Sequence, residues 1–436
     1  MKFRNTKLKY CCSLKGRIGW QNLRSDEFTD EGPYLITGMH FEDGGVDWDK
    51  CFHISPERYA VDHNIHVREG DLLITKDGSI GKLAFIGSLP GPACLNSHLL
   101  IIRPNAGFPS PRFLFYLLKS ERFERYILDE QSGTTFYGLS QESIANFDAA
   151  LPESVQDQIR VAQFLDDATS KINGLISKKH RLIELLEEER AACISRAVTQ
   201  GTDTDVPMGN SGIEWLGRVP GHWQIKRLKI VASLQTGLTL GKHYEESGLV
   251  PRPYLRVANV QDGRLDLSDI AEVSLPAEYA QRYELRSGDV VVTEGGDYDK
   301  LGRGCIWEGQ ISPCLHQNHI FAIRPDTRKL LPQFLSSVMT SVYGRTYFTA
   351  TSQQTTNLAT TNSFKLRNLP VPLPPVAEQD RIVTHLAVLQ GRFSNARGLL
   401  ASAIDRLREY RAALITAAVT GQLDLRKHEN QMAAIA

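Results

Sequence analysis

The chain has 436 residues, and its 50 Lys and Arg residues balance its 50 Asp and Glu residues. A chain of this length is too long for one hydrophobic core, so we expect two or more domains, and the balanced charge favours no particular partner. No apolar run reaches the length of a bilayer span, and the N-terminus lacks the apolar core of a signal peptide. The seven cysteines form no CxxC motif, which argues against a zinc ribbon, and their odd number suits a reducing cytoplasm.

Residues 1–150 mix short β-type runs with Gly, Pro, Asp and Asn punctuation, which predicts one mixed α/β domain, the first head. We expect strands at DLLIT (71–75), LAFIG (83–87) and HLLII (98–102). The stretch PRFLFYLLKSERFERYIL (111–128) predicts a single helix.

Residues 151–200 are poor in Gly, charged and strongly periodic, which predicts a first long helix. Alternate steps of four and three from Val161 give an apolar seam with two polar breaks, Lys179 and Glu189. A seam of this kind is typical of a coiled coil, in which polar breaks fix the register. An alternative is a pair of ordinary core helices. The predicted seam residues of this helix are Leu165, Ile172, Leu175, Leu182 and Leu186.

A polar linker (201–221) leads to a second head (222–370) that repeats the first at an offset near 221. HIFAIRP (319–325) falls on HLLIIRP (98–104), and RSGDVVVT (286–293) falls on REGDLLIT (68–75). Matches in the same order along both halves indicate a tandem duplication. The stretch PQFLSSVMTSVYGRTYF (332–348) predicts the counterpart of the first head's helix.

Residues 371–424 repeat the long helix, since RAALITAAVT (411–420) falls on RAACISRAVT (190–199), and residues 425–436 form a tail. The predicted seam residues are Leu386, Leu389, Phe393, Leu400, Leu407 and Leu414. The predicted fold class is therefore α+β: two mixed α/β heads separated by two long antiparallel helices that form a coiled coil, with pseudo-two-fold symmetry. Such helices would hold the heads at opposite ends of a rod.

Both heads carry sequence features suited to DNA. Residues 1–25 and 222–244 are basic and free of acid, which suits phosphate contacts. Gly-rich loops with basic tips (75–82, 294–304) and loops rich in hydroxyls or amides (131–138, 351–357) provide side chains for base edges. The candidate contacts are Lys15, Arg17, Lys76, Ser79, Lys82, Thr134, Thr135 and Tyr137 in the first head, and Lys242, Tyr244, Lys300, Arg303, Gln353, Gln354 and Thr355 in the second.

Lys76, Lys82, Lys300 and Arg303 suit phosphate or guanine. Gln353 and Gln354 suit adenine, and Thr134 and Thr135 suit polar base edges or phosphate. Plain hairpin turns and a solvated basic surface remain the alternatives for these loops. His98 and His319 have no nucleophile or metal cluster at readable spacing, and we interpret both as structural.

No catalytic motif is readable. GSIGK (78–82) departs from a phosphate loop because Leu83 follows the Lys, and neither a dinucleotide fingerprint nor HExxH is present. The sequence therefore predicts a non-catalytic chain without metal ligands.

Several motifs resemble the specificity (S) subunits of type I restriction–modification systems. They include LPPVAEQDRIVTHL (373–386), its twin LPESVQDQIRVAQFL (151–165) and SGIEWLGRVPGHWQIKRLK (211–229). The chain departs from the family pattern in two ways. The first half lacks a counterpart of IEWLGRVPGHW, and it has VQDQ where the second half has AEQD.

The resemblance implies two target-recognition domains, each reading one half of a bipartite, asymmetric DNA site, with the helices setting the spacer. It also implies two methyltransferase (M) subunits, which use S-adenosylmethionine to methylate adenine N6. Two restriction (R) subunits that use ATP and magnesium complete the complex. Two competing hypotheses are a coiled-coil scaffold that binds only protein, and a stand-alone nuclease or methyltransferase. Salt-dependent, sequence-specific DNA binding would discriminate the DNA-reading subunit from the scaffold.

Overall fold

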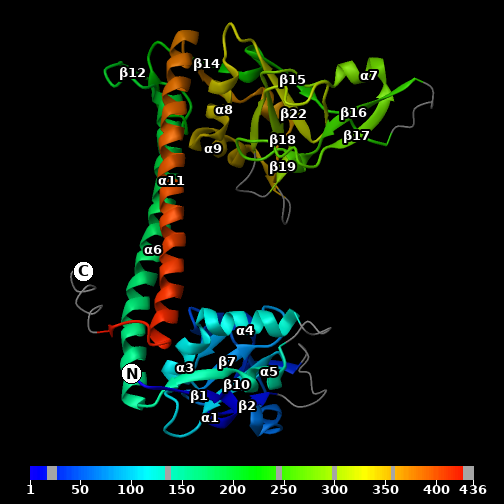
Figure 1. Cartoon of the computed structure of the whole chain (residues 1–436). Helices are drawn as coiled ribbons and strands as arrows, with labels where there is room; N and C mark the ends of the chain where they lie inside the picture. Colours follow the sequence, from blue (N-terminus) through cyan, green and yellow to red (C-terminus); the bar gives the residue numbers. More distant parts are fainter. Residues whose placement is uncertain (17–26, 133–138, 242–247, 297–301, 355–358, 426–436) are drawn as a thin grey trace. The chain divides into compact units, whose positions relative to one another are not determined.

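The computed structural model describes residues 1–16, 27–132, 139–241, 248–296, 302–354 and 359–425 (Figure 1). The chain divides into two compact units, residues 1–180 with 401–436 (unit 1) and residues 181–400 (unit 2). Each unit contains one head together with one part of each long helix. The prediction treated the helices as separate from the heads, whereas the chain contacts divide both helices between the units.

A four-stranded antiparallel sheet, in the order β2-β10-β7-β8, forms the centre of the first head. Its strands are β2 (Cys12–Gly16), β10 (Leu99–Pro104), β7 (Leu72–Thr75) and β8 (Leu83–Phe85). Leu72 and Ile74 join the core on one face of the sheet, and Leu73 joins the core on the other face. Side chains alternate along a strand, so a continuous apolar run belongs to a strand covered on both faces.

Helices cover the first of these faces, and a second sheet, in the order β6-β3-β9, covers the other. The helices are α1 (Leu8–Cys11), α3 (Pro111–Leu118), α4 (Glu121–Ser132) and α5 (Gln141–Asn146). The second sheet consists of β6 (Phe52–Ile54), β3 (Phe28–Ile36) and β9 (Ala93–Leu95). Smaller elements are β1 (Phe3–Lys7) paired with β11 (Asp148–Pro152), β4 (Phe41–Glu42) paired with β5 (Gly45–Val46), and α2 (Pro56–Ala60).

The second head repeats the two main sheets of the first head in the same strand order. Its central sheet, in the order β15-β22-β18-β20, consists of β15 (Ala232–Thr236), β22 (Ile320–Pro325), β18 (Asp289–Thr293) and β20 (Gly304–Trp307). The covering sheet consists of β17 (Ala271–Pro276), β16 (Leu249–Leu255) and β21 (Leu315–His316). The remaining counterparts are β14 (Gln224–Arg227) paired with β25 (Pro370–Leu373), α7 (Ala277–Arg282), α8 (Pro332–Thr340), α9 (Val342–Thr351) and α10 (Ser363–Arg367).

Two small sheets belong to the second half. The hairpin of β12 (Met208–Asn210) and β13 (Arg218–Pro220) lies in the predicted linker. A three-stranded sheet, in the order β19-β24-β23, joins β19 (Gly295–Gly296), β24 (Ala359–Thr360) and β23 (Gln353–Gln354).

The single helix predicted in each head is wrong, because each is two helices. The first breaks between α3 and α4, beside the buried Ser120. The second breaks at Ser341, whose hydroxyl accepts a hydrogen bond from Gly344 N at 3.2 Å and so caps α9. A serine that caps the next helix favours a new start over continuation.

The two long helices, α6 (Val155–Gln200) and α11 (Val376–Val419), lie side by side within each unit (Figure 1). In unit 1, Ile172 of α6 and Leu414 of α11 belong to one core. In unit 2, Val198 of α6 and Leu386 of α11 belong to another. None of the helices in the described part of the chain combines the length and apolar character that a bilayer span requires.

Most predicted seam residues are buried or half-buried, but two residues of α6 are not. Leu175 and Leu182 are 47% and 49% exposed, so their assignment to the seam is wrong. Ile176 packs against the core of unit 1 in place of Leu175, and Ile183 is half-buried. A straight helix has 3.6 residues per turn, so a stripe extrapolated at 3.5 drifts about 20° per heptad away from the contact face. The remaining predicted seam residues are Leu165, Ile172, Leu186, Leu386, Leu389, Phe393, Leu400, Leu407 and Leu414.

The start of the chain packs against the end of α11 in unit 1. Gly421, with φ +74°, lies so close to the Phe3 ring that a Cβ would approach within 2.5 Å. In unit 2, Gly201 follows α6 with φ +79°, and a Cβ there would lie 3.3 Å from the Trp223 ring. Glycine is the usual residue for a left-handed helix end. Phe3 therefore occupies in the first head the place that Trp223 occupies in the second, although the first half lacks the tryptophan motif.

Candidate nucleic-acid interface

The described candidate residues of the first head, Lys15, Lys76, Ser79 and Lys82, lie near one end of the central sheet. Gly16, at the end of β2, pairs with Leu100, and Thr75, at the end of β7, pairs with Leu99. Since these strands are antiparallel, β2 and β7 end and β8 and β10 begin at the same end of the sheet. Leu139 N donates to Lys76 O at 2.8 Å and brings the segment before α5 to this end as well.

The loop between β7 and β8 is fixed by hydrogen bonds to a single threonine. Thr75 Oγ1 donates to Ser79 O at 2.5 Å and accepts from Lys82 N at 2.9 Å. Gly78 and Gly81 have φ +68° and +83°, which suit glycine, so the sequence folds the loop tightly. Ser79 and Lys82 are exposed, whereas Lys76 is half-buried. A fixed loop holds the exposed ammonium of Lys82 at the sheet end at little entropic cost.

The second head builds the same end with different loops. Thr293 N donates to Arg303 O at 3.0 Å, as Thr75 N donates to Lys82 O at 3.0 Å, so Arg303 and Lys82 are structural counterparts. The sheet β19-β24-β23 joins the Gly-rich loop to the amide-rich segment that contains Gln353 and Gln354. The Gly-rich and amide-rich segments, which were predicted separately from the sequence, therefore pair with the same strand, β24.

Gly237 marks a close approach in the second head. A Cβ at this position would lie 2.2 Å from both Gln317 O and His316 O, so the chain after β15 passes directly beside the turn before β22. Lys15 stands at the corresponding end of β2, where it is half-buried. Eight candidates lie outside the described residues, namely Arg17, Thr134, Thr135, Tyr137, Lys242, Tyr244, Lys300 and Thr355.

Each sheet end also carries a histidine–carboxylate pair that the sequence interpretation missed. His98 Nδ1 lies 3.2 Å from Asp77 Oδ2, and His319 Nδ1 lies 2.6 Å from Glu294 Oε2. The two histidine side chains are 61% and 54% exposed, so they stand at the surface beside the candidate loops. The sequence signal for these pairs was the recurrence of the histidine, which precedes a buried strand in both heads, 221 residues apart.

Buried ion pairs brace the opposite end of both sheets. Arg103 donates from Nε and from Nη2 to Asp71, each at 2.7 Å, and Arg324 donates to Asp289 at 2.7 and 2.6 Å. Both carboxylates are almost fully buried, and bidentate geometry makes such hydrogen bonds strong. Each pair ties β7 to β10, or β18 to β22, and so fixes the strands from which the exposed loops emerge.

A second pair of polar anchors ties each head to its long helix. The buried Gln158 of α6 accepts from Ser110 N at 2.7 Å and donates to Pro152 O at 2.8 Å. The buried Gln379 of α11 accepts from Leu331 N at 2.8 Å and donates to Pro374 O at 2.9 Å. Among the described residues, no three His, Cys, Asp or Glu side chains converge as a metal site would require.

The fold and its two sheet ends define a tandemly duplicated protein with two similar, non-identical heads. The family model of the type I restriction modification DNA specificity domain matches residues 18–185 and 220–400. The chain therefore belongs to this family, and the resemblance seen in the sequence is confirmed.

Known relatives agree with this assignment. The specificity subunit of the type I restriction enzyme EcoBI from Escherichia coli is 23% identical over 84% of this chain and 78% of its own. The StySPI specificity subunit from Salmonella potsdam is 21% identical, over 79% and 72% of the two chains. The match to the putative MjaX specificity subunit of Methanocaldococcus jannaschii, 24% identical, spans 46% of this chain and 46% of that relative, so the chain matches about half of its length.

Solved structures share the fold. A chain from a type I R-M system, studied for its complex assembly and conformational transition, has a TM-score of 0.70 at 16% identity, covering 97% of this chain and 98% of its own. The HsdS subunit of Thermoanaerobacter tengcongensis has a TM-score of 0.53 at 17% identity, covering 97% of each chain.

Proposed function

We propose that the chain is the DNA sequence-specificity subunit of a type I restriction–modification complex, and that each head reads one half of a bipartite, asymmetric site. One observation carries this proposal. Both heads keep the same sheet end while their loops differ in length and chemistry. Unlike loops on a common frame are suited to unlike half-sites, because phosphate contacts position a protein and base contacts specify the sequence.

In this proposal the long helices set the spacer and dock two methyltransferase subunits, and through them two restriction subunits. Exposed apolar side chains on α6 and α11 support a docking role, because solvent-facing leucines on a helix are suited to a partner's cover. They are Leu175, Leu182, Leu185, Val388, Leu399 and Tyr410. S-adenosylmethionine, ATP and magnesium then belong to the partner subunits, which carry out adenine N6 methylation and cleavage.

Protection of DNA by the chain with its methyltransferase partner tests the proposal. We expect two protected half-sites about one helical turn apart, with binding that weakens as salt increases. Exchange of residues 1–150 for another such head is expected to change one half-site and leave the other intact. One continuous short footprint, or a change in both half-sites, would overturn the assignment of one head to each half.

The scaffold hypothesis predicts a different result in the same assay. A chain that binds only protein gives no sequence-specific footprint at any salt concentration, although it still assembles with its partners. Lengthening both helices by one heptad provides a second discriminating measurement. We expect the gap between half-sites to change while the half-sites themselves stay the same.

A further inference from the structure

Each unit contains a pocket beside the two long helices, α6 and α11. In unit 1 the pocket lies against α3, and in unit 2 it lies against α8. The pocket volumes are about 440 Å³ in unit 1 and about 650 Å³ in unit 2. Several of their lining residues correspond at the offset of 221 residues. Both pockets contain the first arginine of the repeated Arg-Ala-Ala motif of the long helices, Arg411 in unit 1 and Arg190 in unit 2. The two pockets are therefore copies, and their differences are informative.

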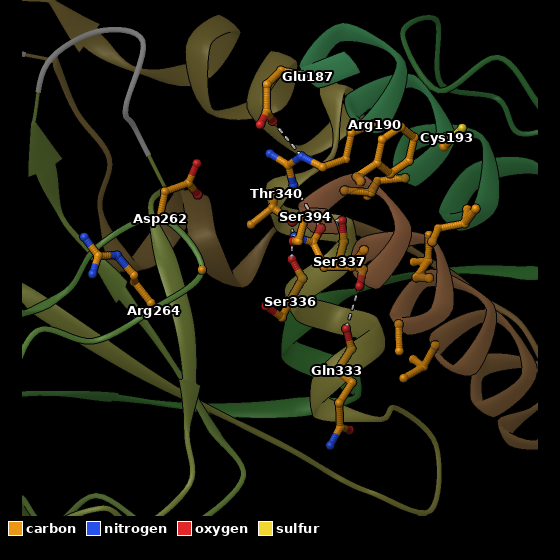
Figure 2. A pocket seen from close by; sticks show the side chains of 18 of the residues that line it. Glu187, Arg190, Cys193, Asp262, Arg264, Gln333, Ser336, Ser337, Thr340 and Ser394 are labelled. Atoms are coloured by element: carbon orange, nitrogen blue, oxygen red, sulfur yellow. Dashed lines mark hydrogen bonds and ion pairs between the residues drawn. The ribbon is translucent and has the colours of Figure 1, made fainter. Parts of the chain in front are cut away.

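In unit 2 the chain supplies its own anion to the arginine. Arg190 Nε donates to Glu187 Oε2 at 2.8 Å, and Arg397 Nη1 lies 3.4 Å from the same carboxylate (Figure 2 shows the first pair). Burial raises the pKa of Glu187, but the two arginines outweigh it and hold the pKa below its usual value. Thr340 and Gln333 contribute uncharged side chains to this pocket, and Asp262 and Arg264 also line it.

In unit 1 the corresponding carboxylate is missing. Arg408 stands where unit 2 has Glu187, and Lys119 stands where unit 2 has Thr340. Arg411 donates to the Asn173 side-chain oxygen, which carries no charge. The Lys119 ammonium lies 4.6 Å from the centre of the Phe115 ring. Within the described part of the chain, neither cation forms an ion pair with a carboxylate.

The acids that line the pocket of unit 1 form no ion pair with these two cations. Asp166 accepts from the guanidinium of Arg112 and from the Tyr116 hydroxyl, both at 2.6 Å. Asp43 and Glu124 complete the acidic lining, and neither pairs with Lys119 or Arg411.

The pKa of Lys119 is lowered mainly by burial, and the neighbouring arginines add to the shift. It falls to about 8, first through burial of the ammonium by the pocket walls and then through Arg411 and Arg112, although Asp43 opposes the shift. Because the side chain is also partly open to solvent at the pocket mouth, a ligand reaches it without rearrangement.

We propose that the pocket of unit 1 binds a phosphate-type oxyanion between Lys119 and Arg411. The anion takes the place that the Glu187 carboxylate fills in unit 2. Arginine offers a planar fork of donors and lysine offers a compact charge, and both are common partners of phosphate. A volume of about 440 Å³ admits either free phosphate or a phosphate monoester of nucleotide size.

Calorimetric titration of the full chain tests this site, with inorganic phosphate and adenosine monophosphate as probes and with potassium chloride holding the ionic strength constant. We expect Lys119→Gln and Arg411→Gln to raise the Kd at least tenfold, whereas Arg411→Lys, which keeps the charge, raises it less. Arg190→Gln is the matched control in the copied pocket and is expected to leave the Kd unchanged. Stronger binding of the monophosphate identifies a monoester as the ligand, and equal binding identifies free phosphate.

A local measurement complements the titration. Acetylation of Lys119 at pH 8, followed by peptide mass spectrometry, is expected to slow severalfold when phosphate is present, while acetylation of the exposed Lys229 does not change. The absence of binding by both probes, equal loss in Arg190→Gln, or equal slowing at both lysines would overturn the proposal. Lys119→Gln keeps the test valid if Arg411→Gln does not fold, because residue 119 is at the surface.

Discussion

The two heads keep their buried polar anchors in common and differ at the surface. The Asp71–Arg103 pair recurs as Asp289–Arg324, with hydrogen-bond lengths equal to within 0.1 Å. A buried charge that loses its partner is costly, so these positions resist change after a duplication. Exposed loops carry no such constraint and are free to acquire new specificity.

The difference also reaches the interior. His316 ends β21 in the second head and is fully buried, whereas Leu95 ends the equivalent strand β9 in the first head. His316 Nδ1 lies 2.9 Å from Ile320 O, and its Nε2 lies 3.3 Å from the Gln235 amide. At this position the second head contains a titratable group where the first head is apolar, so acid is expected to act on this position in unit 2 alone.

The largest expected effect tests the shared anchors. Asp71→Ala is expected to destabilise unit 1 by about 3 kcal/mol, and Asp289→Ala unit 2 by a similar amount, because each leaves a largely buried arginine without its partner. Hydrogen exchange of the sheet amides, measured peptide by peptide, reports each unit separately. The exposed Asp167→Ala is the control and is expected to have little effect. Equal destabilisation of both units by one substitution would contradict the independence of the anchors.

The second prediction uses pH to separate the units. Burial lowers the pKa of His316 to about 4, below its ordinary value near 6.5, so the folded state disfavours protonation. The stability that depends on neutral His316 is fully present above about pH 6.5 and is lost as the pH falls toward 4. When the pH falls from 7 to 5, we expect the free energy of unfolding of unit 2 to decrease by about 2 kcal/mol more in the wild type than in His316→Gln. The comparison of hydrogen exchange at the two pH values measures this difference.

In unit 1, where Leu95 occupies the equivalent position, His316→Gln is expected to leave the pH dependence of exchange unchanged. A pH dependence of unit 2 that is identical in the wild type and the variant would remove His316 as the cause.

The smallest effect concerns the sheet ends. Lys82→Ala and Arg303→Ala are each expected to weaken DNA binding by about 1 kcal/mol and to lower the salt dependence by about one counterion, because each removes one proposed phosphate contact. Arg328→Ala, an exposed arginine that follows the opposite end of β22, is the control. Binding isotherms at several salt concentrations measure both quantities. If Lys82→Ala leaves both quantities unchanged, the sheet end of the first head is not a phosphate contact.

Sequence alone determined the duplication, the central strands and the existence of two long helices, because these depend on local periodicity and on repeated order. It also placed Lys82 and Arg303 in corresponding loops, since loop composition is a local property. Tertiary structure decided which side chains are exposed and which distant residues of the chain contact one another. Leu175 and Leu182 point outward, and two histidines meet carboxylates more than 20 residues away. Arg411 lies against Asn173, 238 residues earlier in the chain. Such pairings depend on the rotation of each helix and on contacts between distant segments, and local periodicity in the sequence does not specify either of them.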